Sequence, residues 1–155
     1  MKKAFIISVF FFSYQFSFSQ TVCGVKEMEE MVGKTIAESQ QKDKVNEVKY
    51  QKALAELGKV KKWDSKQEAA YGLKLIENKD IVACEDNKRK QLTDFMTILS
   101  QADEKNDTEN NCKVIKQVQE KYNVIMDINS KEWNLMLAMI NAEYKTVTKK
   151  DLVIE

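Results

Sequence analysis

The chain has 155 residues, with 25 lysines and arginines, 24 aspartates and glutamates, and no histidine. The net charge of +1 gives no electrostatic reason to expect nucleic acid or an anionic membrane as a partner. Without histidine the chain cannot carry a Ser-His-Asp or Cys-His catalytic set, a histidine zinc ligand, or the Glu-x-x-His motif of di-iron bundles. Pro is absent and Gly occurs four times, which favours long helices over turn-rich β folds.

The first 19 residues are typical of a secretory signal peptide, with two lysines, an apolar stretch over 4–12, and small residues in Ser17-Phe18-Ser19. We expect cleavage after this stretch, leaving 20–155 as one exported domain, periplasmic or secreted, without stable membrane insertion. The alternative of a membrane anchor is disfavoured, since a span needs about 20 apolar residues. A lipoprotein site at Cys23 is disfavoured because the preceding residues lack the required Leu.

The mature chain begins with a predicted helix over 22–60. Val25, Met28, Val32 and Ile36 are spaced by 3, 4 and 4 residues, which is the helical period. The apolar stripe fades over the polar interval 38–44, which is a kink, a break or an exposed turn of helix. The stripe then resumes at Val45, Val48, Leu54, Leu57 and Val60.

A turn over 62–65 separates this helix from a second one predicted over 66–102. Ser65 and Glu68 fit a capping box at its start. The stretch 84–91 is highly charged, and a break near 78–80 is the alternative to one continuous helix. The proposed apolar stripe comprises Ala69, Leu73, Ile76, Ile81, Cys84, Leu92, Phe95 and Leu99, interrupted by Lys88.

A polar turn over 103–110 precedes the third predicted helix, which is capped by Asp107 or Thr108 and runs to about residue 146. The tail with Leu152 and Ile154 is either a strand-like packing segment or frayed chain. Three long helices joined by short turns predict an all-α fold, an elongated antiparallel three-helix bundle built from helical hairpins.

The bundle register predicts which of the three cysteines pair. Folding the chain back at about residues 63 and 105 brings Cys23 within about one turn of Cys112, whereas Cys84 falls far along the axis from both. Because a disulfide needs Cα atoms within about 7 Å, Cys23–Cys112 is the expected bridge. Cys84 is then a free thiol, either a small core residue or a reactive one. A break near 78–80 would restore Cys84–Cys112 as an option.

No motif in the sequence indicates a catalytic site, a metal site or a cofactor. Trp133, Met136 and Met139 in the third helix, with Trp63 in the first turn, are candidates for a protein interface because Trp and Met are enriched there. Core packing at helical spacing is the simpler interpretation of the same residues, and Trp63 would then cap the core against Val147 or Leu152.

We therefore expect a non-enzymatic, exported protein-interaction module without a cofactor, whose partner is another protein and not nucleic acid. An inhibitor or immunity-type binding protein is the leading hypothesis. An accessory subunit of an envelope secretion or conjugation apparatus is an alternative based on fold analogy. A small-ligand or metal carrier that works through Met and Cys is another. A homo-oligomer is compatible with each of these hypotheses.

Overall fold

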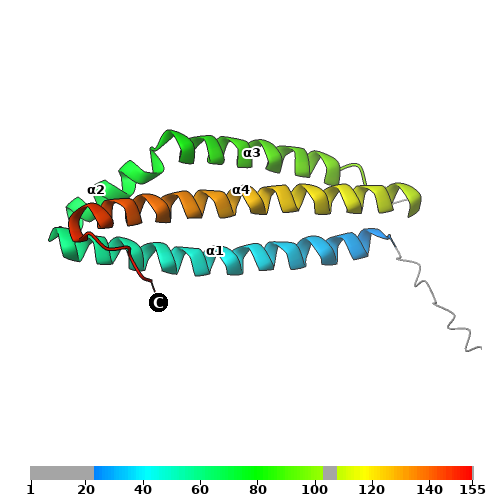
Figure 1. Cartoon of the computed structure of the whole chain (residues 1–155). Helices are drawn as coiled ribbons and strands as arrows, with labels where there is room; N and C mark the ends of the chain where they lie inside the picture. The colour runs from blue at the N-terminus through cyan, green and yellow to red at the C-terminus, as the bar shows by residue number, and fades with distance from the viewer. Residues whose placement is uncertain (1–22, 103–107, 155) are drawn as a thin grey trace, which may run out of the picture.

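The computed structural model describes residues 23–102 and 108–154 (Figure 1). These ranges form four helices, α1 (Val25–Lys61), α2 (Ser65–Ile76), α3 (Lys79–Leu99) and α4 (Thr108–Thr148). The all-helical prediction is confirmed for this part of the chain. The expected leader over 1–19 and its cleavage site lie outside the described residues. None of the four helices is both long and apolar enough to cross a membrane.

The first predicted helix, α1, continues through its polar interval without a break. The interval over 38–44 therefore forms exposed turns of a regular helix, the third of the alternatives left open by its sequence. The helix ends where Lys62 adopts a left-handed conformation with φ of 55°, and the Lys62 amide donates to backbone carbonyls of the last turn, including that of Gly58.

The second predicted helix is two helices, so the expectation of three helices is wrong for the described chain. α2 ends at Ile76 and α3 starts at Lys79, where the Asn78 side chain accepts a hydrogen bond from the Asp80 amide at 2.9 Å. This N-cap satisfies a backbone donor that a helix start would leave without a partner, so the interruption costs little. The interruption also changes which side of α2 faces the core: Leu75 is buried, whereas Leu73 and Ile76, which belong to the expected stripe, are exposed.

The capping box at the start of α2 lies one residue earlier than predicted. Asp64 is the N-cap, and its side chain accepts from the Gln67 amide at 2.8 Å. The Gln67 side chain accepts from the Asp64 amide at 2.9 Å. The Asp64/Gln67 pair therefore takes the role expected of Ser65 and Glu68, because Asp and Gln provide the same two acceptors one position earlier.

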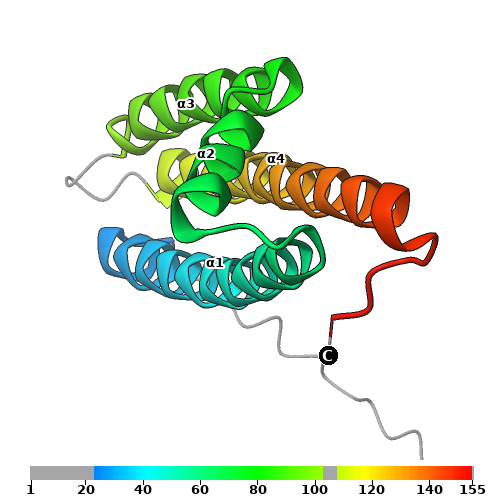
Figure 2. The ribbon, with the colours of Figure 1, turned by 90° about the vertical axis from the view of Figure 1, so that its left-hand side faces the viewer.

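The helices form an elongated bundle in which α2 and α3 follow one another beside α1 and α4 (Figure 1). α4 lies between α1 and α3, and both approach it, whereas no Cα atoms of α1 and α3 come within 8 Å of each other. α1 and α4 run in the same direction and α3 runs opposite to both (Figure 1). α2 approaches α1, α3 and α4, and Figure 2 shows it rising from the end of α1 to the start of α3. At the α2 end the helices α1, α2 and α4 therefore all approach one another, whereas at the other end α1 and α3 stay apart.

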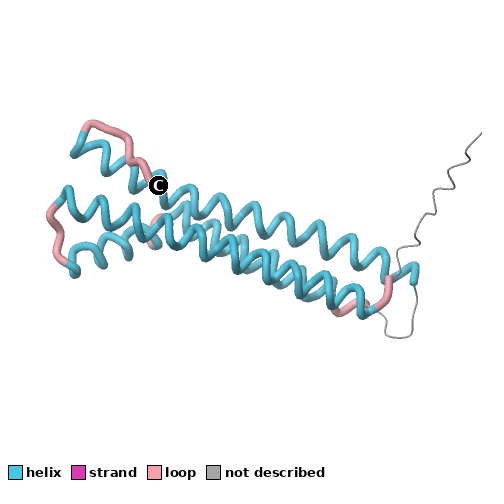
Figure 3. The backbone as a smooth tube through the Cα atoms, turned by 90° about the horizontal axis from the view of Figure 1, so that it is seen from below, coloured by secondary structure: helices cyan, strands magenta, loops and turns pink. Residues whose placement is uncertain are grey.

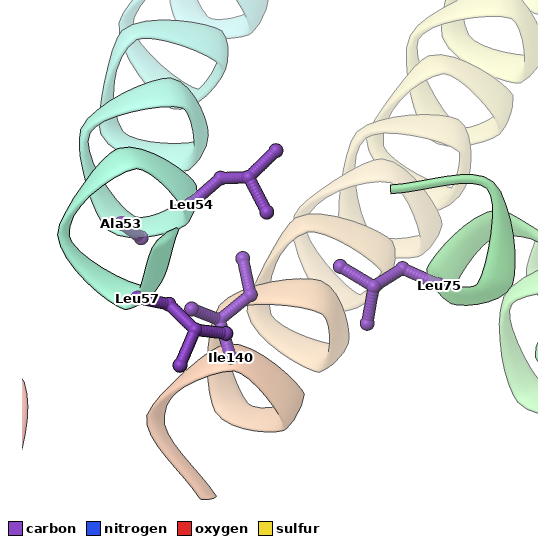
Figure 4. Close-up of a cluster of buried hydrophobic side chains, with 5 residues drawn as sticks. All are labelled: Ala53, Leu54, Leu57, Leu75 and Ile140. Atoms are coloured by element: carbon purple, nitrogen blue, oxygen red, sulfur yellow. The ribbon is translucent and has the colours of Figure 1, made fainter. Parts of the chain in front are cut away.

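Two hydrophobic clusters hold the ends of the bundle. The α2-end cluster is centred on Ala53, Leu54, Leu57, Leu75 and Ile140, which come from α1, α2 and α4 (Figure 4). The disulfide-end cluster is centred on Met28, Phe95, Val114 and Val118, which come from α1, α3 and α4. Each cluster thus joins three helices, and together they determine which faces of the helices point inward.

The C-terminal tail turns back after α4 (Figure 3). Leu152 and Ile154 are half-buried against the α2-end cluster, and the Leu152 amide donates to Asn141 Oδ1 at 2.7 Å. Lys145 holds Asp151 in an ion pair at 3.0 Å. Of the two alternatives for the tail, it is a packing segment, although it is not a strand.

Candidate functional site

The cysteines take the places expected from the bundle register. Cys23 and Cys112 form a disulfide with their Cα atoms 5.0 Å apart. It joins the start of α1 to the start of α4 beside the disulfide-end cluster. Cys84 is a buried free thiol. It lies in a cleft of about 640 Å³ between α3 and α4, whose lining includes Asp80, Asn87, Asp127 and Lys131. No group of three or more potential metal-binding side chains occurs among the described residues.

A layer of polar side chains crosses the middle of the bundle between the two hydrophobic clusters. On the α1 side, Asp43 Oδ1 accepts hydrogen bonds from Asn129 Nδ2 at 2.5 Å and from Trp133 Nε1 at 3.1 Å. On the α3 side, Lys88 Nζ lies 2.6 Å from Glu132 Oε2 and 2.7 Å from Glu85 Oε1. Lys88 also reaches Asn129 Oδ1 at 3.5 Å, so the layer connects all three long helices.

Two carboxylates share the Lys88 ammonium on the α3 side of the polar layer. Burial raises the pKa of Glu132 above its usual value, more than its hydrogen bond from Lys88 lowers it. The pKa of Glu85, which is more exposed, is lowered chiefly by its hydrogen bond from Lys88. For Lys88, burial lowers the pKa, but the hydrogen bonds and charges of both carboxylates more than offset this and raise it. The resulting ion-pair network links α3 to α4 through Lys88 and Glu132.

The four predicted interface residues do not form one surface. Met136 is buried, so it contributes to packing in this structure. Trp133 packs edge-on against Tyr50 with ring centroids 6.1 Å apart, and Met139 and Trp63 pack against the α2-end cluster. The Trp63 ring lies 4.9 Å from that of Tyr71. Trp63 and Leu152 border the same cluster, whereas Val147, its other expected neighbour, is exposed.

A surface feature that sequence reasoning missed lies on the outer side of α1. Val45 and Val48, expected in the core, are exposed and line a hollow of about 390 Å³ that extends to Ile154 of the tail. The rest of the lining is Gln41, Lys44, Lys49 and Lys52. The lysines that flank the valines on both sides indicate an exposed position, but the 3-residue spacing of the valines also fits a core stripe. We call this surface the lysine-rimmed hollow.

Comparison with protein-family models, with curated proteins and with solved structures gives no match for this chain. The candidate sites are therefore defined by the geometry and chemistry of the molecule itself.

Proposed function

We propose that this chain is an exported, non-enzymatic protein-binding module of the inhibitor or immunity type, and that the lysine-rimmed hollow is its partner-binding face. The observation that carries the proposal is the combination of exposed Val45 and Val48 with a lysine border on a helix that is otherwise regular. Apolar side chains surrounded by charge, rather than scattered singly, are the usual composition of a protein-binding patch.

The chemistry of the hollow selects an acidic partner segment with apolar side chains. The two valines and Ile154 offer apolar contact area, and Lys44 and Lys49 supply positive charge at its edge. Charges at the rim of an interface mainly accelerate association and select partners, whereas desolvated apolar contacts hold the complex together. The partner face is therefore expected to carry carboxylates around one or two large apolar side chains.

The rigidity of the scaffold supports an inhibitor-type role. The Cys23–Cys112 disulfide and the polar layer fix α1 against α4 along most of its length. A preorganised surface loses little conformational entropy on binding, which favours tight complexes from a modest contact area. An accessory subunit of an envelope apparatus and a small-ligand carrier remain the competing functions that the experiment below distinguishes.

The proposal is tested by capturing partners of the tagged mature protein in its native cells after mild cross-linking, with identification by mass spectrometry. A dominant toxin or hydrolase whose activity is blocked by the added protein would support the inhibitor role. A set of envelope machinery components would instead support the accessory subunit, and bound metal or ligand would support the carrier.

The location of the binding face is tested by reversing charge at the hollow. The double variant Lys44→Glu, Lys49→Glu should reduce affinity for the captured partner at least tenfold, mainly through slower association that depends on ionic strength. Lys116→Glu, at an exposed position of α4, is the matched control and should retain wild-type affinity. Equal affinities for the wild type and the double variant would place the binding face elsewhere.

A further inference from the structure

The C-terminal tail is tied to α4 by polar contacts close to the point where it leaves the helix. α4 ends where Lys149 takes a left-handed conformation with φ of 60°. Asn141 clamps the tail at two points, because its Oδ1 accepts from the Leu152 amide at 2.7 Å and its Nδ2 donates to Asp151 Oδ1 at 3.4 Å. Lys145 adds an ion pair with Asp151 at 3.0 Å. These contacts direct the tail from the end of α4 back toward α1 (Figure 1).

The outer part of the tail contacts the bundle through alternate side chains. Leu152 and Ile154 are half-buried, whereas Val153 between them is 78% exposed. Ile154 lines the lysine-rimmed hollow together with Val45 and Val48 of α1. A period of two is the pattern of an extended segment that lies on a surface. The tail therefore places one aliphatic side chain at the hollow and presents the preceding one to solvent.

The composition of the tail is complementary to that of the hollow. The sequence from Asp151 to Glu155 has three aliphatic residues between two acidic ones, and Glu155 itself lies outside the described residues. The hollow has two valines in its lining and the lysines Lys44, Lys49 and Lys52 around them. Apolar contact at the centre and opposite charge at the rim are typical of a protein-binding surface and its ligand. The chain thus carries, in its own tail, a segment of the chemistry that the hollow selects.

We propose that the tail is a reversible intramolecular ligand of the lysine-rimmed hollow, and that a partner must displace it in order to bind there. The side chains of the Lys145–Asp151 ion pair are 57% and 64% exposed, and exposed pairs add little to stability. The attachment therefore depends mainly on the half-buried Leu152 and Ile154, so the tail can detach while the helices stay folded. The inference rests on the proposed function, because it takes the hollow as the binding face and states how access to that face is regulated.

The covalent connection to α4 determines how strongly the tail competes. A segment joined to its site by a short linker has an effective concentration in the millimolar range, taken as about 10 mM. A free peptide with two half-buried aliphatic side chains makes few contacts, and we expect a dissociation constant of about 1 mM. The tail then occupies the hollow most of the time, and a competing segment binds roughly tenfold more weakly than it would to an empty hollow.

The test uses a synthetic peptide with the sequence of residues 150–155, titrated into the isotope-labelled mature chain and followed by nuclear magnetic resonance. The full-length double variant Leu152→Ser, Ile154→Ser loses the aliphatic contacts of its own tail and should bind the peptide. The wild type, whose hollow is occupied, should bind it roughly tenfold more weakly. Val153→Ser changes the exposed residue of the same tail and is the matched control, which should behave like the wild type. Circular dichroism checks that all variants keep the wild-type helix content.

Two further measurements locate the site to which the peptide binds. Adding Lys44→Glu and Lys49→Glu to the double variant should weaken peptide binding about fivefold or more, because both rim charges are reversed. In the unmodified wild type, saturating peptide should shift the Leu152 amide resonance, since displacement of the tail breaks its hydrogen bond to Asn141.

Three results would each overturn the proposal: no binding to the double variant, equal binding to the double variant and the wild type, or binding that the charge reversal leaves unchanged. The experiment contains no partner, so it is read separately from the proposed function. Peptide binding as expected, together with a captured partner that ignores the hollow, would contradict the proposed function and leave the intramolecular contact in place.

Discussion

The two ends of the bundle are closed in different ways. At the α2 end α1, α2 and α4 all approach one another, and the cluster around Leu57 and Ile140 is covered by aromatic side chains and by the tail. At the disulfide end α4 lies between α1 and α3, which stay apart, and the covalent link between Cys23 and Cys112 ties α1 to α4. Packing therefore stabilises one end, whereas a cross-link supplements a less enclosed core at the other.

This difference has a physical origin in how closely the helices approach one another around the core. Where α1, α2 and α4 all approach one another, they enclose the side chains between them, and Leu57 and Ile140 are completely buried. Where α1 and α3 stay apart, the side between them is less covered, and Ile36 of α1 and Met96 of α3 are exposed. A small core that cannot bury enough apolar area commonly depends on a disulfide. We therefore expect mutations at the α2 end to lower stability mainly through lost packing, and removal of the cross-link to weaken mainly the disulfide end.

The largest effect is expected from removing the disulfide. The double variant Cys23→Ala, Cys112→Ala frees two residues separated by 89 positions and should lower the free energy of unfolding by about 4–5 kcal/mol, as the chain-entropy model gives for such a loop. Urea denaturation measures the loss, and hydrogen exchange should show faster opening at the disulfide end. Cys84→Ala is the control and should lose less, since this thiol is not bridged. Uniformly faster exchange along the chain would contradict the division into two ends.

A core truncation at the α2 end should be the next largest effect. Ile140→Ala removes a completely buried side chain and should cost about 3–4 kcal/mol, through lost burial and the cavity that remains. Val118→Ala in the disulfide-end cluster removes fewer carbons and should cost about 2 kcal/mol. Both are measured by thermal and urea denaturation of the oxidised protein. A larger loss for Val118→Ala would reverse the assignment of the packing-dominated end.

Alkaline pH should weaken the α2 end in particular. Burial, followed by the charge of Glu143 and by Tyr50, raises the pKa of Tyr71 from 10.0 to about 12. The folded protein thus holds this proton more tightly than the unfolded chain, so the stabilisation is complete below pH 10 and is lost as the pH rises through 12. The raised pKa of Lys88 acts in the same direction above its ordinary value of 10.5.

Titration of stability against pH by urea denaturation measures this dependence. Tyr71→Phe removes the ionisable group next to Trp63, so the fall in stability between pH 10 and 12 should be shallower than in the wild type. The remaining fall should shrink further in Tyr71→Phe, Lys88→Met. Identical slopes for the wild type and Tyr71→Phe would show that Tyr71 does not contribute.

The smallest changes in stability are expected from substituting two glycines of α1, one toward each end of the bundle. Apart from its chain neighbours and the nearby backbone of α1, nothing lies within 4 Å of the position that a Cβ would take at Gly33, so Gly33→Ala should stabilise the protein by about 0.5–1 kcal/mol through helix propensity. At Gly58 the added carbon would lie 3.0 Å from Glu68 Oε2 of α2. Gly58→Ala should therefore gain less or destabilise. Thermal melts of both variants are sufficient, and an equal gain at both sites would contradict the closer packing at the α2 end.

The amino-acid sequence by itself determined the helical class and the levels of residues along the bundle. A helix rises about 1.5 Å per residue whatever surrounds it, so counting from the turns placed Cys23 beside Cys112 and Cys84 far from both. The break at Glu77–Asn78 did not disturb this count, because α2 and α3 run in the same direction along the axis.

Only the tertiary structure decided what lies beside each helix. Leu73, Ile76, Val45 and Val48 have the spacing of core residues and are exposed, whereas the charged Glu132 and polar Asn129 are buried. Helical period defines a stripe, but burial of that stripe depends on whether another helix lies against it. α2 lies close to both α1 and α4, whereas α3 lies close to α4 and not to α1. Which apolar side chains are covered is therefore a property of the assembled helices and of no single segment.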